Sequence, residues 1–226
     1  MDWDEYERRV HAEFGRAGHR KMCAHDAVGD VDDALVAEYR AELDRAMDES
    51  PMQGFLEKHP AMLVGELGPQ CRWVLPRVTL AGKYVPDFLT ARLDSTGVKW
   101  TLIELESPRV EKLFTRDGTP ARQLAKGIAQ ISDWRSWLGN NQDMARRPRS
   151  EHGLGLIGIE GYITPGLLII GRASDRTDDV RPRLNQLMAQ NMINIRSYDW
   201  LTREVTKRRE FRERFGSVCD ECVTTS

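Results

Sequence analysis

The chain has 226 residues, with 33 Lys and Arg, 35 Asp and Glu, and a formal net charge of -2. Since a domain averages roughly 150 residues, we expect one compact core with an extension, and composition excludes collagen-like and disordered chains. No apolar run approaches the roughly 20 residues that cross a bilayer, and the first residues, MDWDEYERRV, lack the pattern of a secretory signal. Four scattered cysteines agree with the cytoplasmic location that we expect.

Charge is distributed unevenly along the chain. Residues 1–49 carry 14 Asp and Glu against 7 Lys and Arg, whereas residues 50–226 carry 21 acidic and 26 basic residues. A basic body suits a polyanionic partner such as nucleic acid. An ordinary solvated surface is the alternative, because the excess is small.

The first elements are predicted to be helical. Residues 1–30 mix glycines with many charges and predict broken helix and loop, while apolar residues at helical spacing predict a helix over residues 31–47. Ser50 and Pro51 begin a further helix, with serine as its cap and proline in its first turn. We therefore divide the chain into an acidic helical extension (residues 1–49), a core domain (50–215) and a tail (216–226).

After residue 72 the spacing of the apolar residues changes from the helical period to a period of two residues. Segments 73–80, 84–93 and 98–106 predict an antiparallel meander, because they are rich in β-branched and aromatic residues and are separated by turn signals. A helix over residues 119–138, strands over 154–159 and 166–170, a helix over 178–191, a strand over 193–198 and a helix over 200–215 follow. This order predicts an α/β fold in which helices flank a mixed sheet.

Acidic residues interrupt the apolar pattern of the third predicted strand. Glu104 and Glu106 share a face with Trp100 and Leu102, and the preceding turn brings Asp87 opposite Glu104. Three carboxylates are expected to converge, and such a cluster usually implies a bound cation. Oxygen ligands favour Mg²⁺ or Mn²⁺. The alternative is that both glutamates lie at a strand end in solvent and Asp87 caps a turn.

The same residues carry a resemblance to a known family. Pro86-Asp87 followed by Glu104-Leu105-Glu106 resembles the PD-(D/E)xK nuclease motif with glutamate in place of its lysine. Six segments in register resemble the nuclease domain of the Shedu anti-phage defence family over roughly residues 50–202: FLEKHPAML, VPDFL, WTLIELESP, AQISDWRSWL, LLIIGR and IRSYDWL. The resemblance implies a restriction-endonuclease-like fold, divalent-metal-dependent DNA cleavage, a role in phage defence and homo-oligomers.

The resemblance also implies roles for particular residues. Asp87 and Glu104 match the metal-binding acids, and Glu57 matches an acidic position on the helix before the sheet, as a further or water-mediated ligand. Gln130 and Trp134 are similar to a Gln-x-x-x-Tyr pair in related nucleases, although tryptophan retains only the packing part of that pair.

The departure at Glu106 matters most for the chemistry. A lysine there would orient the attacking water and stabilise developing negative charge. Glutamate can bind metal or act as a general base instead, but it supplies no positive charge. A second metal ion is one substitute for that charge. Lys126 is another, because it shares a helix face with Gln130 and Trp134.

Other cations and thiols give weaker signals. Arg146, Arg147, Arg149 and Arg172 are candidate contacts for the DNA backbone, although Arg172 is as readily explained by an ion pair with an acid of the core. A zinc site combining Cys219 and Cys222 with Cys23 and His25 is a further alternative, to which plain thiols are preferred.

These features predict a cytoplasmic, homo-oligomeric and divalent-metal-dependent endodeoxyribonuclease. The alternative is a catalytically inactive nuclease-fold module for DNA binding or assembly. A two-carboxylate glycosidase is disfavoured, because no aromatic sugar platform accompanies the acids.

Overall fold

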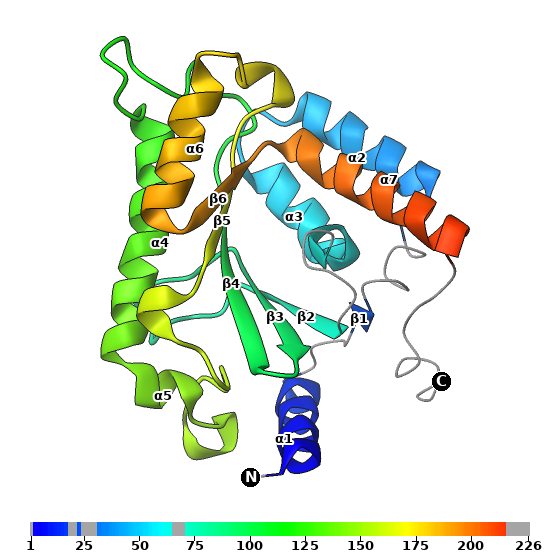
Figure 1. Cartoon of the computed structure of the whole chain (residues 1–226), viewed down its shortest axis with the longest axis vertical. Coiled ribbons are helices and arrows are strands. Elements are labelled where there is room, and N and C mark those ends of the chain that lie inside the picture. Colours follow the sequence, from blue (N-terminus) through cyan, green and yellow to red (C-terminus); the bar gives the residue numbers. More distant parts are fainter. Residues whose placement is uncertain (1, 18–21, 24–30, 65–70, 216–226) are drawn as a thin grey trace.

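A computed structural model describes residues 2–17, 22–23, 31–64 and 71–215 of the chain (Figure 1). The helices are α1 (Trp3–Arg16), α2 (Asp33–Arg45), α3 (Ser50–Lys58), α4 (Arg122–Asn140), α5 (Gln142–Arg146), α6 (Val180–Asn191) and α7 (Tyr198–Phe215). The strands are β1 (Met22–Cys23), β2 (Cys71–Pro76), β3 (Phe88–Asp94), β4 (Gly97–Leu105), β5 (Gly166–Ile169) and β6 (Ile193–Arg196). Within these ranges no helix is long and apolar enough to span a membrane.

The six strands form one mixed sheet in chain order, which confirms the predicted α/β fold. Strands β1 to β4 pair antiparallel, and β4, β5 and β6 pair parallel. The chain between β4 and β5 crosses over through α4, as a parallel connection requires. Strand β4 is therefore central, with β3 on one side and β5 on the other.

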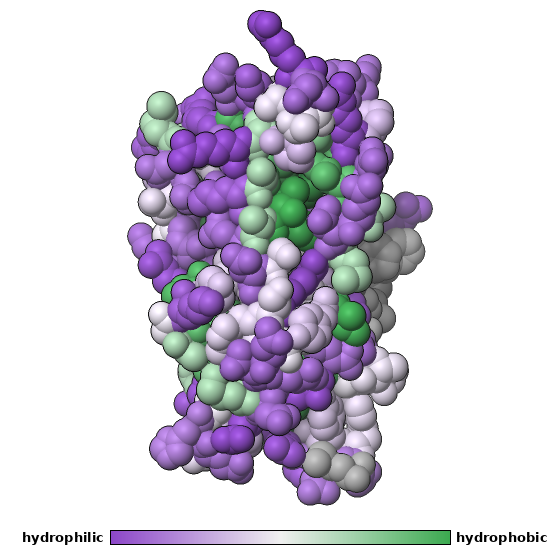
Figure 2. Space-filling model, turned by 90° about the vertical axis from the view of Figure 1, so that its left-hand side faces the viewer, coloured by the Kyte–Doolittle hydropathy of each residue, from purple (hydrophilic) through white to green (hydrophobic). Residues whose placement is uncertain are grey.

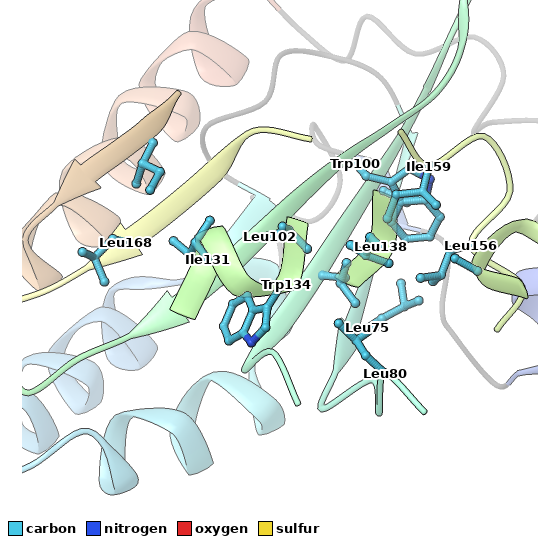
Figure 3. Close-up of a cluster of buried hydrophobic side chains, with 14 of the residues drawn as sticks. Leu75, Leu80, Trp100, Leu102, Ile131, Trp134, Leu138, Leu156, Ile159 and Leu168 are labelled. Atoms are coloured by element: carbon cyan, nitrogen blue, oxygen red, sulfur yellow. The ribbon is translucent and has the colours of Figure 1, made fainter. Parts of the chain in front are cut away.

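Two apolar clusters cover the two faces of the sheet. Trp100 and Leu102 of β4 pack into the cluster that includes α4, α6 and α1, and Ile131 and Trp134 lie over the sheet there (Figure 3). Ile103 and Leu105 pack into the other cluster, with α2, α3 and α7. Figure 1 shows α4 and α6 on one side of the sheet and α2, α3 and α7 on the other. The predicted alternation along β4 is thus confirmed.

The surface on the α4 and α6 side is mostly hydrophilic. Figure 2 shows this face with a recessed apolar area in its upper half, surrounded by polar side chains. Partly buried apolar residues of these helices, including Ile128, Leu187 and Met188, pack against the first cluster. The helices therefore cover their side of the sheet as an amphipathic layer.

Several sequence predictions fail. The strand expected over residues 154–159 is absent, because Gly155 and Gly158 adopt φ values of 69° and 73° and the backbone N–H of Leu156 donates to α5 at Ala145. The expected strands 73–80 and 84–93 are shorter, since Pro76 and Pro86 cannot donate to a ladder.

The N-terminal region also differs from its prediction. Residues 3–16 form the continuous helix α1 rather than broken helix and loop, because Val10 and Phe14 are fully buried on one face of it. Glu49, not Ser50, occupies the cap position of α3. The domain division at residue 50 stays a prediction, although α1 and α2 both contribute to the apolar clusters.

Candidate active site

Asp87 and Glu104 meet at the carboxyl end of β4. Asp87 lies one residue before β3, and the register that pairs Phe88 with Ile103 brings it opposite Glu104. Its Oδ2 accepts a hydrogen bond of 2.7 Å from the backbone N–H of Leu105. The carboxyl of Glu104, which is 4% exposed, hydrogen-bonds to the Asp87 carboxylate. The predicted contact between these two acids is therefore present.

Burial changes the acidity of this pair. Desolvation and the neighbouring charge of Asp87 raise the pKa of Glu104 to about 10. Desolvation also raises the pKa of Asp87, against the hydrogen bond from Leu105. Two carboxyls in contact cannot both ionise cheaply, so near neutral pH the pair shares one proton.

Glu106 is held beside this pair but faces a different partner. Its side chain is 2% exposed, and its Oε1 lies 2.9 Å from Nζ of Lys126 on α4. Burial raises the pKa of Glu106, although the ammonium of Lys126 opposes that shift. Burial lowers the pKa of Lys126, but Glu106, Glu49 and Glu104 together outweigh burial and raise it. Helix α4 thus delivers a positive charge to the acidic site.

The backbone around Glu106 is fixed from several sides. Its N–H donates to Ile169 of β5, and its carbonyl accepts a 2.8 Å hydrogen bond from the hydroxyl of Tyr198. The carbonyl of Tyr198 accepts in turn from the buried hydroxyl of Tyr39. Gly127 allows α4 to lie close, because a Cβ there would be 2.6 Å from Cδ1 of Leu168 and 3.2 Å from Cγ of Glu106. These contacts limit the positions open to the Glu106 side chain.

Gln130 lies one helical turn beyond Lys126. Its Oε1 is buried and, among the described residues, has no hydrogen-bond partner. Trp134, one turn further along, is buried in the apolar cluster. The packing role expected for Trp134 therefore fits, and Gln130 retains an acceptor for a water or ligand.

Glu57 is engaged by other residues. Its Oε1 accepts hydrogen bonds from Gln53 at 2.9 Å and from Nε of Arg77 at 2.7 Å. The hydrogen bond from Gln53 and the pairing with Arg77 lower the pKa of Glu57, and together they outweigh the opposing effect of burial. Gln53 also donates to the backbone carbonyl of Asp87 at 3.4 Å. Glu57 thus helps to position Gln53, which in turn contacts the backbone of Asp87.

No three or more His, Cys, Asp or Glu side chains among the described residues form a group that could hold a metal ion. The three carboxylates therefore do not form the metal-binding cluster that we expected, although Glu106 lies beside the pair and its charge acts on Glu104. Asp87 and Glu104 pair with each other, and Lys126 holds Glu106. Cys219, Cys222 and His25 lie outside the described residues.

Glu49 is an acidic neighbour that the sequence reasoning missed. It occupies the cap position of α3, and its charge acts on Asp87, Glu106 and Lys126. Its place, eight residues before Glu57, put it inside the predicted extension. Only the tertiary packing of α3 against the sheet brings it near the acids.

The predicted DNA-contacting arginines are largely paired within the protein. Arg172 binds Asp199 and Asp44, with Nη–Oδ distances of 3.0 and 2.9 Å, so the ion-pair alternative holds for it. Arg146 donates to the carbonyl of Ile159 and Arg149 to Glu13. Arg147 is exposed.

The basic loop lies far from the acidic pair. Arg146 lines a cavity with Gly97 and Val98, at the start of β4. Glu104 is seven residues beyond Gly97 on that strand, or roughly 23 Å at about 3.3 Å per residue. The structure therefore does not bring Arg146 beside the acids.

Fold and site together define an α/β protein with paired buried carboxylates and a lysine at the carboxyl end of its central strand. The family model described as Shedu protein SduA, C-terminal, matches residues 46–202, which is more than half of the chain. The chain belongs to this family. A comparison with curated proteins gave no match.

Proposed function

We propose that this protein is a divalent-metal-dependent DNA endonuclease that acts in defence against phage. The contact between Asp87 and Glu104, with the Lys126–Glu106 ion pair beside it, carries the proposal. Membership of the Shedu family supports the defence role. Among the described residues, no other cluster of buried acids with a cation contains the residues of the nuclease-like motif.

The acidic pair fits a magnesium or manganese ion. Mg²⁺ is usually held by one or two carboxylates together with waters and substrate phosphates, so two carboxylates suffice. Asp87 and Glu104 share a proton that a divalent cation would displace, and both present hard oxygen donors. When bound there, the ion would supply an activated water and offset charge on the phosphate oxygens.

The other residues have separate roles in this proposal. Glu106 takes the proton of the attacking water, since burial raises its pKa and makes it a stronger base. The water oxygen bonds to phosphorus while the ester bond on the opposite side breaks, and solvent protonates the leaving oxygen. Gln130 accepts a hydrogen bond from the water through its buried Oε1.

Lys126 replaces the motif lysine. Its ammonium, 2.9 Å from Glu106, offsets the negative charge that develops on the phosphate oxygens. Glu106 positions that ammonium, so glutamate at the motif position and lysine on α4 form one unit. We further propose that the protein assembles into homo-oligomers, as the family resemblance implies.

Plasmid nicking in Mg²⁺ tests the proposed function. Glu104→Gln keeps the size of the side chain and removes the carboxylate that the metal would bind, so nicking should be lost while the protein remains folded by circular dichroism. Asp133→Asn, at an exposed position of α4, is the matched control and should nick like the wild type. Nicking by Glu104→Gln at the wild-type rate would refute the assignment.

The alternative of an inactive DNA-binding or assembly module makes the opposite prediction. It expects salt-dependent DNA binding with no cleavage in any divalent metal. Glutamate at the motif position is the observation that favours it, and the Lys126–Glu106 pair is the observation against it.

A further inference from the structure

A second cavity lies where α6, the end of β6 and the start of α7 meet. Its volume is about 260 Å³, and four arginines line it: Arg176, Arg181, Arg196 and Arg203. None of Asp87, Glu104, Glu106 or Lys126 lines it. It is therefore separate from the acidic site.

The lining carries a concentrated positive charge. No Asp or Glu is among the described residues that line the cavity. Asp199 and Asp175, whose charges act on Arg176, accept hydrogen bonds from Arg172 outside the lining. Arg181, 65% exposed, pairs with Asp178 at the rim. Burial lowers the pKa of Arg176, and the charges of Asp175 and Asp199 raise it more than those of Arg196 and Arg203 lower it. Since burial is the largest of these effects, an anion in the cavity would stabilise the charged guanidinium of Arg176.

Two buried donors in the lining have no partner among the described residues. They are Nη1 of Arg176 and Oγ of Ser197. Nη2 of Arg176 donates to the carbonyl of Ile170 at 2.8 Å, which fixes the orientation of the guanidinium. Ser197 is 2% exposed and directly precedes α7, an 18-residue helix whose N-terminal dipole favours negative charge. Leaving such donors unpaired is costly, so they indicate a ligand that accepts from both.

The remaining wall is apolar and includes an aromatic ring. Leu184, Met188, Ile195 and Trp200 line it, and the guanidinium of Arg196 lies 5.8 Å from the centre of the Trp200 ring. Pockets for drug-sized ligands usually measure roughly 300–1,000 Å³, so this cavity suits a smaller molecule. A flat, partly apolar group next to an anionic group matches such a lining.

We infer that this cavity binds a nucleotide, with its phosphate monoester among Arg176, Arg203 and Ser197 and its base against the wall that contains Trp200. A guanidinium binds phosphate through two parallel hydrogen bonds, so several arginines favour a dianionic monoester over a neutral ligand. The phosphate could belong to a free mononucleotide or to the end of a DNA strand. The inference goes beyond the proposed hydrolysis, since it needs no metal.

Calorimetric titration of the full chain in EDTA tests this inference. Deoxyadenosine monophosphate should bind once per chain, inorganic phosphate should compete with it more weakly, and deoxyadenosine should not compete. Arg203→Glu should weaken binding at least about tenfold, because it reverses one charge at an exposed position. Arg181→Glu, also at an exposed position, should weaken nucleotide binding as well. Arg183→Glu is the matched control, because Arg183 lies on α6 against Phe114, outside the cavity.

Two further experiments are needed. One distinguishes a free nucleotide from the end of a DNA strand, and the other tests nucleotide binding separately from the proposed nuclease activity. Tighter, Arg203-dependent binding of a 5′-phosphorylated oligonucleotide than of its 5′-hydroxyl form would identify a strand end, and equal binding would identify the free nucleotide. Glu104→Gln should bind the nucleotide normally even though it should not nick DNA. Absence of nucleotide binding at about 1 mM, or equal weakening by Arg203→Glu and Arg183→Glu, would overturn the inference.

Discussion

Nζ of Lys126 lies 2.9 Å from Oε1 of Glu106, so a lysine on α4 makes an ion pair with the glutamate that follows β4. Glu106 stands at the position where the resembled nuclease motif carries lysine. Lys126 on α4 therefore supplies the positive charge that the motif lysine would otherwise provide from the strand.

Removing the ammonium of Lys126 should slow DNA nicking. Lys126→Met keeps the length of the side chain and removes its charge, and the loss of one charge-stabilising group typically costs about 10²–10³ in rate. Initial rates of plasmid nicking measure this. Lys99→Met, at an exposed position near the start of β4, is the control and should retain the wild-type rate. Equal rates for Lys126→Met and wild type would exclude a catalytic part for Lys126.

Exchanging the two charges tests whether they act as one unit. Glu106→Lys alone should abolish nicking, because it places a second ammonium where Lys126 already lies. The double change Glu106→Lys with Lys126→Glu should recover at least about tenfold over Glu106→Lys alone, since the pair is restored in reverse. Gain of cleavage by the single change would instead support the inactive-module alternative.

Stability without metal should depend on pH through Glu104. Burial and Asp87 raise the pKa of Glu104 to about 10 in the folded state, while the unfolded chain releases that proton near its usual 4.5. The folded state therefore binds more protons, and its free energy of unfolding should fall as pH rises from about 5 to about 10, by up to about 1 kcal/mol per pH unit.

Urea denaturation in EDTA between pH 5 and 9 measures this slope. Glu104→Gln removes the titrating group, so the decline should be much shallower in that variant and its stability at pH 8 should exceed that of wild type. A wild-type curve as flat as that of the variant would contradict the raised pKa of Glu104.

Close packing of α4 over the site predicts a cost for Gly127→Ala. The new Cβ would lie 2.6 Å from Leu168 and 3.2 Å from Glu106, so the substitution should lower the free energy of unfolding by about 1–3 kcal/mol. Gly54→Ala is the control, because nothing lies within 4 Å of a Cβ there and alanine favours helix α3 by about 0.5–1 kcal/mol. Urea denaturation should show opposite signs for the two variants.

Local pattern was enough to predict the core of the site. Alternation along β4 places Leu102 and Glu104 on one face, and the turn from Asp94 to Gly97 fixes the register that brings Asp87 to Glu104. Both depend on residues close in sequence. The expected strand over 154–159 failed because its backbone hydrogen-bonds to α5 rather than to a neighbouring strand, while its apolar residues are buried in the first apolar cluster.

The partners of Glu106 required the tertiary structure. Lys126 is twenty residues away on a helix that Gly127 allows to lie close to Leu168 of the sheet. Glu49 and Tyr198 reach the same region from α3 and α7, which pack from the opposite face. Sequence spacing placed Lys126 on a face with Gln130 but gave no distance to Glu106.

A crystal soaked with Mn²⁺ tests the central claim most directly. The account predicts anomalous density for a metal between the carboxylates of Asp87 and Glu104, and loss of that density in Glu104→Gln. Density elsewhere, or none at an Mn²⁺ concentration that supports nicking, would contradict it.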